Sequence, residues 1–212
     1  MTDENGAPHV ILTGGASSPP EVLPLLMLDK LILFPMAAMP IRLTDPNEKR
    51  LIDEAVLGPK MVVVLTLRES GGVSNALDAA FDVGTTARIL QLQRLPDDSL
   101  VVLLQALQRF RPRGLSRREP YPFVRVQVLQ DKVTLPEKIP ALATAIRQQM
   151  TRYAQLSPTM PDEAAHVLDN IDDPGRLADT IAAHLPLKLD NKQLVLDLAD
   201  VKARLENLYE QL

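Results

Sequence analysis

Cysteine and tryptophan are both absent from this 212-residue sequence. Without cysteine the chain can form no disulfide, no thiolate metal site and no cysteine nucleophile, and this composition fits a reducing compartment. Only three tyrosines and four phenylalanines occur, so the core must be built from Leu, Val, Ile and Ala. The net charge of -4 argues against a dedicated nucleic-acid binder, because such proteins usually carry a basic excess.

The common patterns of catalytic and metal sites are missing as well. The three histidines, His9, His166 and His184, stand alone on their segments, without a second ligand at helical spacing. No glycine is followed by lysine, so the P-loop pattern for ATP is absent, and no serine has a histidine or lysine beside it at a local spacing. The acidic pairs at 97–98 and 172–173 are explained by turn and helix-cap chemistry. We therefore expect no catalytic residue, metal site or cofactor site in this chain.

Long hydrophobic runs are also lacking. The longest apolar stretch, Leu31 to Ile41, is too short to cross a bilayer and is interrupted by Pro35 and Pro40. The amino terminus has no basic region ahead of an apolar one, so the pattern of a signal peptide is missing. The simplest localisation is the cytoplasm, away from membranes.

What the sequence does contain is a clear β-hairpin signal between Val83 and Arg111. Thr85 to Gln93 alternates between apolar and polar residues, with Ala87 and Ile89 expected inside, and an apolar run begins at Leu100. The turn sequence Leu-Pro-Asp-Asp-Ser between them combines proline with side chains that bond their own backbone. A hairpin alone is marginal in water, so other strands must cover its apolar face.

Four more strand-like segments and one helix are predicted before residue 131. The strands are expected at Leu23–Leu33, Met36–Leu43, Met61–Leu67 and Phe123–Gln130. Asp45-Pro46-Asn47-Glu48 has the marks of a helix start, and Gly58-Pro59 ends that helix. This set of elements suits a small closed or half-closed β-barrel. We expect residues 1–21 to form a disordered tail and Glu69–Asn75 a moving loop.

After Pro136 the apolar residues follow a helical period to the end. Helices are expected at Ile139–Leu156, at Asp162–Ile171, from Asp173-Pro174 to Leu185, and from Asp190 onward. The last helix carries a coiled-coil-like seam with alternating steps of four and three: Leu194, Leu198, Val201, Leu205, Leu208 and Leu212. Since it lacks a terminating glycine or proline, we expect a continuous helix that is cut short at Leu212. The predicted domains are a barrel at 22–131 and a helical bundle at 136–212.

A basic cluster raises the question of a nucleic-acid partner. Its arginines lie within ten residues and are Arg109, Arg111, Arg113, Arg117 and Arg118. A small β-barrel with a basic loop can bind RNA. The acidic total and the lack of aromatic residues for base stacking favour instead a solvated loop, or docking to an acidic surface of another domain.

Methionines give a second hint of a partner. Met27, Met36 and Met39 accompany Phe34 in the proline-broken stretch from Leu23 to Leu43. Flexible thioethers suit surfaces that accept many apolar partners. The sequence alone favours the simpler interpretation, in which they fill a core that is poor in aromatic residues, and their exposure distinguishes the two interpretations.

Four separated stretches resemble, in order, the amino-terminal domain of the ATP-dependent Lon proteases. They are LPLLMLDKLILFPMAAMPI at 23–41, VGTTARILQLQRLPDDSLVVLLQALQRFR at 83–111, EPYPFVRVQVL at 119–129 and DDPGRLADTIAAHLPLKLDNKQLVLDLADVKARLENLYEQL at 172–212. The sequence departs from the family at 27–30, Met-Leu-Asp-Lys in place of Pro-Leu-Arg-Asp, and at the extra Pro122, whereas Glu48 and Lys49 match a charged pair of the family. The resemblance implies an α+β fold, a small PUA-like β-barrel followed by an all-α helical bundle.

The resemblance also implies a function. The chain is expected to be a catalytically inert substrate-recognition and assembly region, while ATP, Mg²⁺ and a Ser-Lys dyad belong to modules of a hexameric parent protease that this chain does not contain. We expect weak capture of apolar segments of unfolded or misfolded proteins, strengthened by avidity, on a surface with Phe34, Met36, Met39, Glu48 and Lys49. The alternatives are a stand-alone Lon-domain adaptor and a PUA-like RNA-binding protein.

Overall fold

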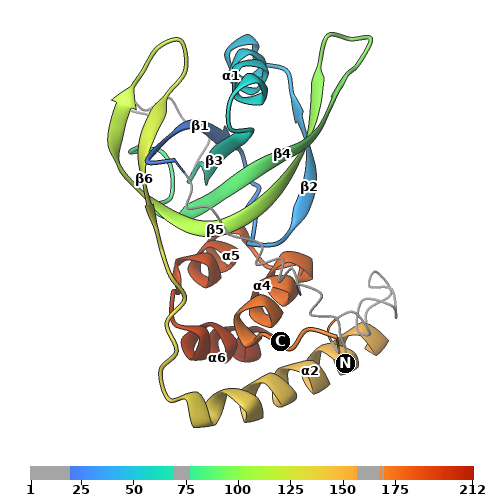
Figure 1. Cartoon of the computed structure of the whole chain (residues 1–212). Helices are drawn as coiled ribbons and strands as arrows, with labels where there is room; N and C mark the ends of the chain where they lie inside the picture. The colour runs from blue at the N-terminus through green and yellow to red at the C-terminus, as the bar shows by residue number, and fades with distance from the viewer. Residues whose placement is uncertain (1–19, 69–76, 157–167, 169) are drawn as a thin grey trace, which may run out of the picture.

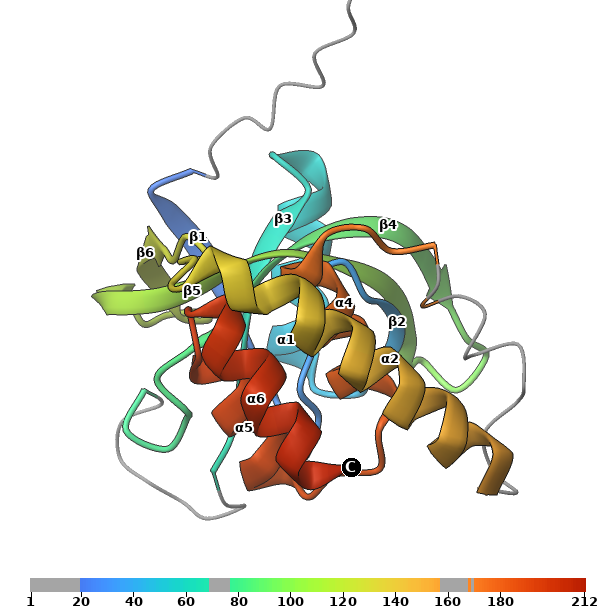
Figure 2. The ribbon, with the colours of Figure 1, turned by 90° about the horizontal axis from the view of Figure 1, so that it is seen from below.

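The computed structural model describes residues 20–68, 77–156, 168 and 170–212. Figures 1 and 2 show a sheet-rich part and, on one side of it, a group of helices. The predicted tail, the predicted loop at Glu69–Asn75 and most of the predicted helix at Asp162–Ile171 lie outside the described residues. No described helix combines the length and the hydropathy that a membrane span requires.

Six strands in the described residues form one mixed sheet with the order β2-β5-β4-β3-β1-β6. They are β1 (Val22–Leu28), β2 (Ala38–Leu43), β3 (Met61–Thr66), β4 (Gly84–Arg94), β5 (Leu100–Arg117) and β6 (Phe123–Val128). β1 and β3 are parallel, and the other pairs are antiparallel. The long strand β5 continues beyond its pairing with β4 and pairs there with β6, so the pairings β5-β4-β3-β1-β6 return to β5.

The predicted hairpin and first helix are confirmed. Leu95 N donates to Ser99 O at 2.9 Å and closes the turn between β4 and β5. Helix α1 (Pro46–Leu57) starts at Asp45, whose carboxylate accepts hydrogen bonds from the backbone N–H groups of Asn47 and Glu48. The apolar face of α1 packs on the sheet, and β3 is buried along its whole length, as its β-branched sequence predicts.

The remaining helices are η1 (Pro136–Lys138), α2 (Ile139–Leu156), α4 (Pro174–His184), α5 (Leu189–Asp197) and α6 (Val201–Gln211). Helices α2 and α4 match the predictions, and Asp173 caps α4 by accepting from Arg176 N at 2.6 Å. Sheet and helices together agree with the predicted α+β class. In Figure 1 these helices lie below the sheet, and α1 lies above it.

The prediction of one continuous final helix is wrong. α5 ends at Asp197 and α6 begins at Val201, because the Asp200 carboxylate caps a new helix by accepting from Ala203 N at 2.8 Å. The chain between the helices pairs with Lys132, which donates to Ala199 O and accepts from Val201 N. The predicted seam is therefore divided between two helices, and Leu194, on α5, is exposed.

The helices and the sheet are joined through a shared core. Ile32, Phe34 and Val83 come from the sheet-rich part, yet they pack in the same buried cluster as the apolar faces of α2, α4, α5 and α6. Gln193 of α5 adds a polar link, because its amide nitrogen donates to Val83 O at 2.9 Å. The segment before β2 is therefore held between sheet and helices. The predicted boundary between two domains near 131–136 stays a prediction.

Candidate functional site

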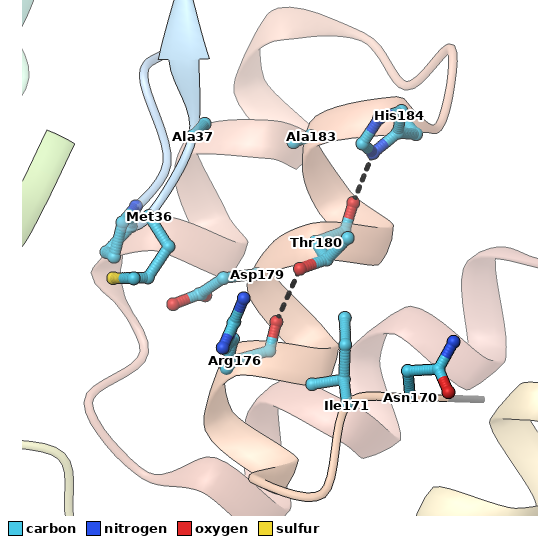
Figure 3. Close-up of a pocket in the computed structure, with 10 residues that line it drawn as sticks. Met36, Ala37, Asn170, Ile171, Arg176, Asp179, Thr180, Ala183 and His184 are labelled. Carbon is cyan, nitrogen blue, oxygen red and sulfur yellow. Dashed lines mark hydrogen bonds between the residues drawn. The ribbon is translucent and has the colours of Figure 1, made fainter. Parts of the chain in front are cut away.

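A pocket of about 330 Å³ lies between the segment that enters β2 and helix α4. Figure 3 shows Met36 and Ala37 on one side and the residues of α4 opposite them. The pocket combines small apolar and polar groups, contributed by Pro35, Met36, Ala37, Asn170, Ile171, Arg176, Asp179, Thr180, Ala183 and His184.

Met36 presents its side chain at this pocket from an unusual backbone. Its φ is 67°, a left-handed conformation that is uncommon for residues other than glycine. Met36 N donates to Ala106 O at 3.0 Å, and Ala106 N donates to Ala37 O at 2.9 Å, so β5 holds both residues in place. The methionine is 47% exposed, although it directly follows the buried residues 32–35. The thioether is thus held at the surface by backbone contacts.

The opposite wall is one face of α4. Arg176, Thr180 and His184 follow each other at steps of four, which places them in a row along the helix. The Thr180 hydroxyl donates to Arg176 O at 2.9 Å, and His184 Nδ1 lies 2.8 Å from Thr180 O. These contacts to the helix backbone, drawn in Figure 3, hold the threonine and histidine close to α4. Both side chains therefore lie against the backbone of the helix that carries them.

A buried charge network supports the floor of the pocket. Arg109 of β5 donates from Nη1 to Asp179 Oδ2 at 2.8 Å, and Arg204 of α6 donates from Nη1 to Asp179 Oδ1 at 3.1 Å. Arg204 Nη2 also donates to Asp131 Oδ1 at 2.7 Å. The side chains of Arg109, Asp179 and Arg204 are only 3%, 4% and 0% exposed. One carboxylate thus joins the sheet, α4 and α6.

A side chain at Gly175, in the first turn of α4, would displace the Asp131 carboxylate of this network. A Cβ atom there would lie 2.6 Å from Asp131 Oδ2, well inside normal contact distance. Breaking a buried ion pair from one side is costly, because the remaining charge stays desolvated. A substitution at Gly175 would therefore disturb the ion pair between Asp131 and Arg204.

A family comparison places this architecture among known proteins. Residues 22–212 match the family model described as the ATP-dependent protease La (LON) substrate-binding domain. The chain belongs to the Lon substrate-binding domain family. The resemblance seen in the sequence is thereby confirmed.

Full-length relatives of this Lon domain are much longer. This chain is 40% identical over 189 residues to the Lon protease of Roseiflexus castenholzii, and the match covers 89% of this chain and 23% of that protein. This chain is 34% identical over 186 residues to the Lon protease of Escherichia coli, and the match covers 88% of this chain and 24% of that protein. The chain thus spans about a quarter of the length of these relatives.

Solved structures share the fold. The N-terminal domain of a Mycobacterium avium complex Lon protease matches with a TM-score of 0.70 at 20% identity, over 89% of this chain and 96% of that one. A Lon N-terminal domain protein from Xanthomonas campestris matches with a TM-score of 0.61 at 22% identity, over 88% and 96%. At these identities the likeness concerns the fold alone.

The Lon domain does not bring the predicted site residues together. Phe34 is 1% exposed and packs among the helical residues, so its assignment to a binding surface is wrong. The physical reason is that an aromatic-poor chain uses this large side chain to join the sheet to the helices. Met39 is half-buried against the cluster under α1. Of the three predicted apolar residues, Met36 alone is exposed.

Glu48 and Lys49 lie at the other end of the sheet. Lys49 Nζ donates to Asp98 O at 2.9 Å and pairs with the Asp98 carboxylate, whose pKa this hydrogen bond lowers. Burial, followed by the charge of Asp45, raises the pKa of Glu48. The β5 residues between the two ends, 100 to 106, span about 20 Å at the usual rise of a strand. Met36 and the charged pair therefore cannot form one small site.

The arginine cluster is also divided by the fold. It lies on the long strand β5 and the residue after it, so the interpretation as a loop is wrong. Arg109 is buried and pairs with Asp179 of α4, while its predicted docking to an acidic surface of another domain stays a prediction. Arg117 stacks on the Phe123 ring, with its guanidinium carbon 4.1 Å from the ring centre.

Sequence reasoning missed Arg176 and Asp179, the charged residues of the pocket wall. A signal for Asp179 was present, because it stands on α4 between the apolar residues Leu177, Ala178 and Ile181, which are all buried. A carboxylate on a buried helical face requires a charged or hydrogen-bonding partner. No comparable signal identified Arg176, since an exposed arginine on a helix is common.

Proposed function

We propose that this chain is the substrate-recognition region of an ATP-dependent Lon-type protease, and that it captures exposed apolar segments of unfolded or misfolded proteins beside Met36. The observation that carries the proposal is a methionine held at the surface by its backbone, at the mouth of a pocket that combines small apolar and polar groups. Thioether side chains adapt to many apolar shapes. A partner side chain would lose water contact there without a large rearrangement of the domain.

The proposed capture is weak for a single domain. One side chain seated beside Met36 buries little area, so affinity must come from several contacts or several copies. We propose that the parent protein assembles as a hexamer, whose copies would add avidity. ATP, Mg²⁺ and the Ser-Lys dyad would act in modules outside this chain. We also propose that the strand circuit through β5 and β6 is a PUA-like β-barrel and that the later helices are its accompanying bundle.

A backbone NMR titration with a permanently unfolded protein tests the capture. Shifts should centre on residues 35–37 and α4. Met36→Asn removes the thioether but suits the left-handed backbone, since asparagine tolerates positive φ. We expect this variant to bind about tenfold more weakly, as loss of about 1.4 kcal/mol of apolar burial implies.

Leu57→Asn is the matched control, because Leu57 is 89% exposed on α1, far from the pocket. Its affinity should equal that of the unchanged chain. Equal losses in both variants would contradict the proposal, and so would shifts confined to the end of the sheet near the β4–β5 turn, where Glu48 and Lys49 lie. A parallel titration with a short RNA should produce no shifts at Arg113, Arg117 or Arg118 that vanish in salt, and such shifts would favour the RNA-binding alternative.

A further inference from the structure

Two pockets of different charge flank Met36 and Arg176. The second pocket, of about 210 Å³, is lined by three carboxylates, those of Asp131, Asp173 and Asp179. Of the described residues that line the 330 Å³ pocket, Asp179 alone carries a carboxylate. The two sides therefore offer different electrostatic surroundings to a polypeptide that passes between β2 and α4.

The charge of Asp179 is already compensated. It is buried and paired with both Arg109 and Arg204, so it contributes little field to the pocket. Arg176 is exposed on the wall, and none of the ion pairs among the described residues involves its guanidinium. Among the described residues, the 330 Å³ pocket thus places a guanidinium without an ion-pair partner beside an exposed thioether.

We propose that this pocket selects polypeptide segments in which an apolar residue is adjacent to an aspartate or glutamate. The apolar side chain would pack on Met36, and the neighbouring carboxylate would pair with the guanidinium of Arg176. The inference rests on the proposed function and adds a substrate preference to it. Guanidinium and carboxylate have matching planar geometry, which makes this pair directional as well as charged.

A lysine next to the apolar residue would be disfavoured at the same position. Like charges in one pocket repel, so discrimination comes from the unfavourable pair as well as from the favourable one. Because the Arg176 side chain is exposed, the effect on affinity is modest and depends on salt. Arg176 would therefore influence which segment is captured, while Met36 provides the apolar contact.

Fluorescence anisotropy with three labelled peptides tests this preference. Each peptide has the same Gly/Ser-rich flanks and a central leucine pair followed by Asp, Asn or Lys. With the unchanged chain at low salt, we expect the Asp peptide to bind about threefold to fivefold more tightly than the Lys peptide. With Arg176→Glu the order should reverse. This variant should fold normally, since glutamate three residues after the Asp173 cap is favourable in a first helical turn.

Arg88→Glu is the control, an exposed charge reversal on β4 that should leave the peptide order unchanged. An order that stays the same with Arg176→Glu, or that reverses equally with Arg88→Glu, overturns the inference. If all three peptides bind equally and Met36→Asn weakens that binding about tenfold, the selection by Arg176 fails while the proposed function stands. If no peptide binds to the unchanged chain, both fail.

Discussion

Two Arg–Asp pairs on the β4–β5 hairpin differ chiefly in their surroundings. At the turn end, Arg94 Nη2 lies 2.7 Å from both carboxylate oxygens of Asp53, and the two side chains are 56% and 42% exposed. At the helical end, Arg109 Nη1 lies 2.8 Å from Asp179 Oδ2, and both side chains are almost fully buried. Contact distance therefore does not distinguish them.

Burial does distinguish them. An exposed pair gains little, because water and salt compete with it and two long side chains must be ordered. The buried pair must be kept whole: Asp179 also accepts from Arg204, and Arg109 Nε also donates to Leu196 O at 2.9 Å. The helical end of the sheet is thus held by contacts that depend on one another, and the candidate pocket lies on this end.

The largest expected effect is a loss of stability when the aspartate of each pair is removed. Asp179→Ala leaves two buried arginines with too little negative charge and should lower the free energy of unfolding by about 3–5 kcal/mol. Asp53→Ala should lower it by less than about 1 kcal/mol. Urea denaturation of both variants measures the difference. Similar losses for the two would mean that burial does not separate the pairs.

A smaller effect should distinguish the buried Phe34 from the exposed Met36, because one substitution should change stability and the other should change binding. Phe34→Leu should lower the free energy of unfolding by about 1 kcal/mol, because the leucine fills most of the buried space. It should leave polypeptide binding unchanged. Met36→Asn should show the opposite pattern, with near-normal stability and weakened binding. Urea denaturation and the NMR titration test both, and a large loss of binding with Phe34→Leu would argue against the assignment of Phe34 to the core alone.

The smallest effect concerns two carboxylates with opposite pKa shifts. Burial raises the pKa of Asp197, which lies at the helical end of the sheet. Ionisation of this carboxyl in the folded chain is therefore unfavourable, and the free energy of unfolding falls as pH rises from 3.8 through the folded pKa. At the turn end, the hydrogen bond from Lys49 lowers the pKa of Asp98, whose contribution is present above 3.8 and lost as pH falls through the folded pKa. Asp197→Asn should therefore be more stable than the unchanged chain at pH 7, and Asp98→Asn less stable.

Both differences should vanish at low pH, where the aspartates are protonated in the folded and unfolded chains. For Asp197→Asn this happens below 3.8, the ordinary value, and for Asp98→Asn only below the lowered folded pKa. Thermal unfolding between pH 2 and 8 measures the sign of each difference. A loss of stability for Asp197→Asn at pH 7 would show that its hydrogen bond with Gln193 outweighs the cost of burying the charge.

The sequence predicted most of the local structure because the signals are local. Asp45 and Asp173 cap helices with their own carboxylates, and the turn before Ser99 closes through adjacent residues. The site was predicted less well. Met36 was among the candidates and lies at the pocket, but Phe34 was assigned to the same surface although it is buried. Phe34 and Met36 are two residues apart in a stretch that is interrupted by proline. The periodicity of apolar residues therefore could not assign one to the core and the other to the surface.

By itself, the sequence determined the strands, the caps, most of the helices and the membership of the Lon family, because periodicity, cap chemistry and motif order act over short distances. The tertiary structure alone decided three further matters. The backbone between α5 and α6 pairs with Lys132, Arg109 of the basic cluster forms a buried ion pair with Asp179, and Arg176 lies opposite Met36. Each depends on contacts between residues far apart in the chain, for which a single sequence carries no spacing.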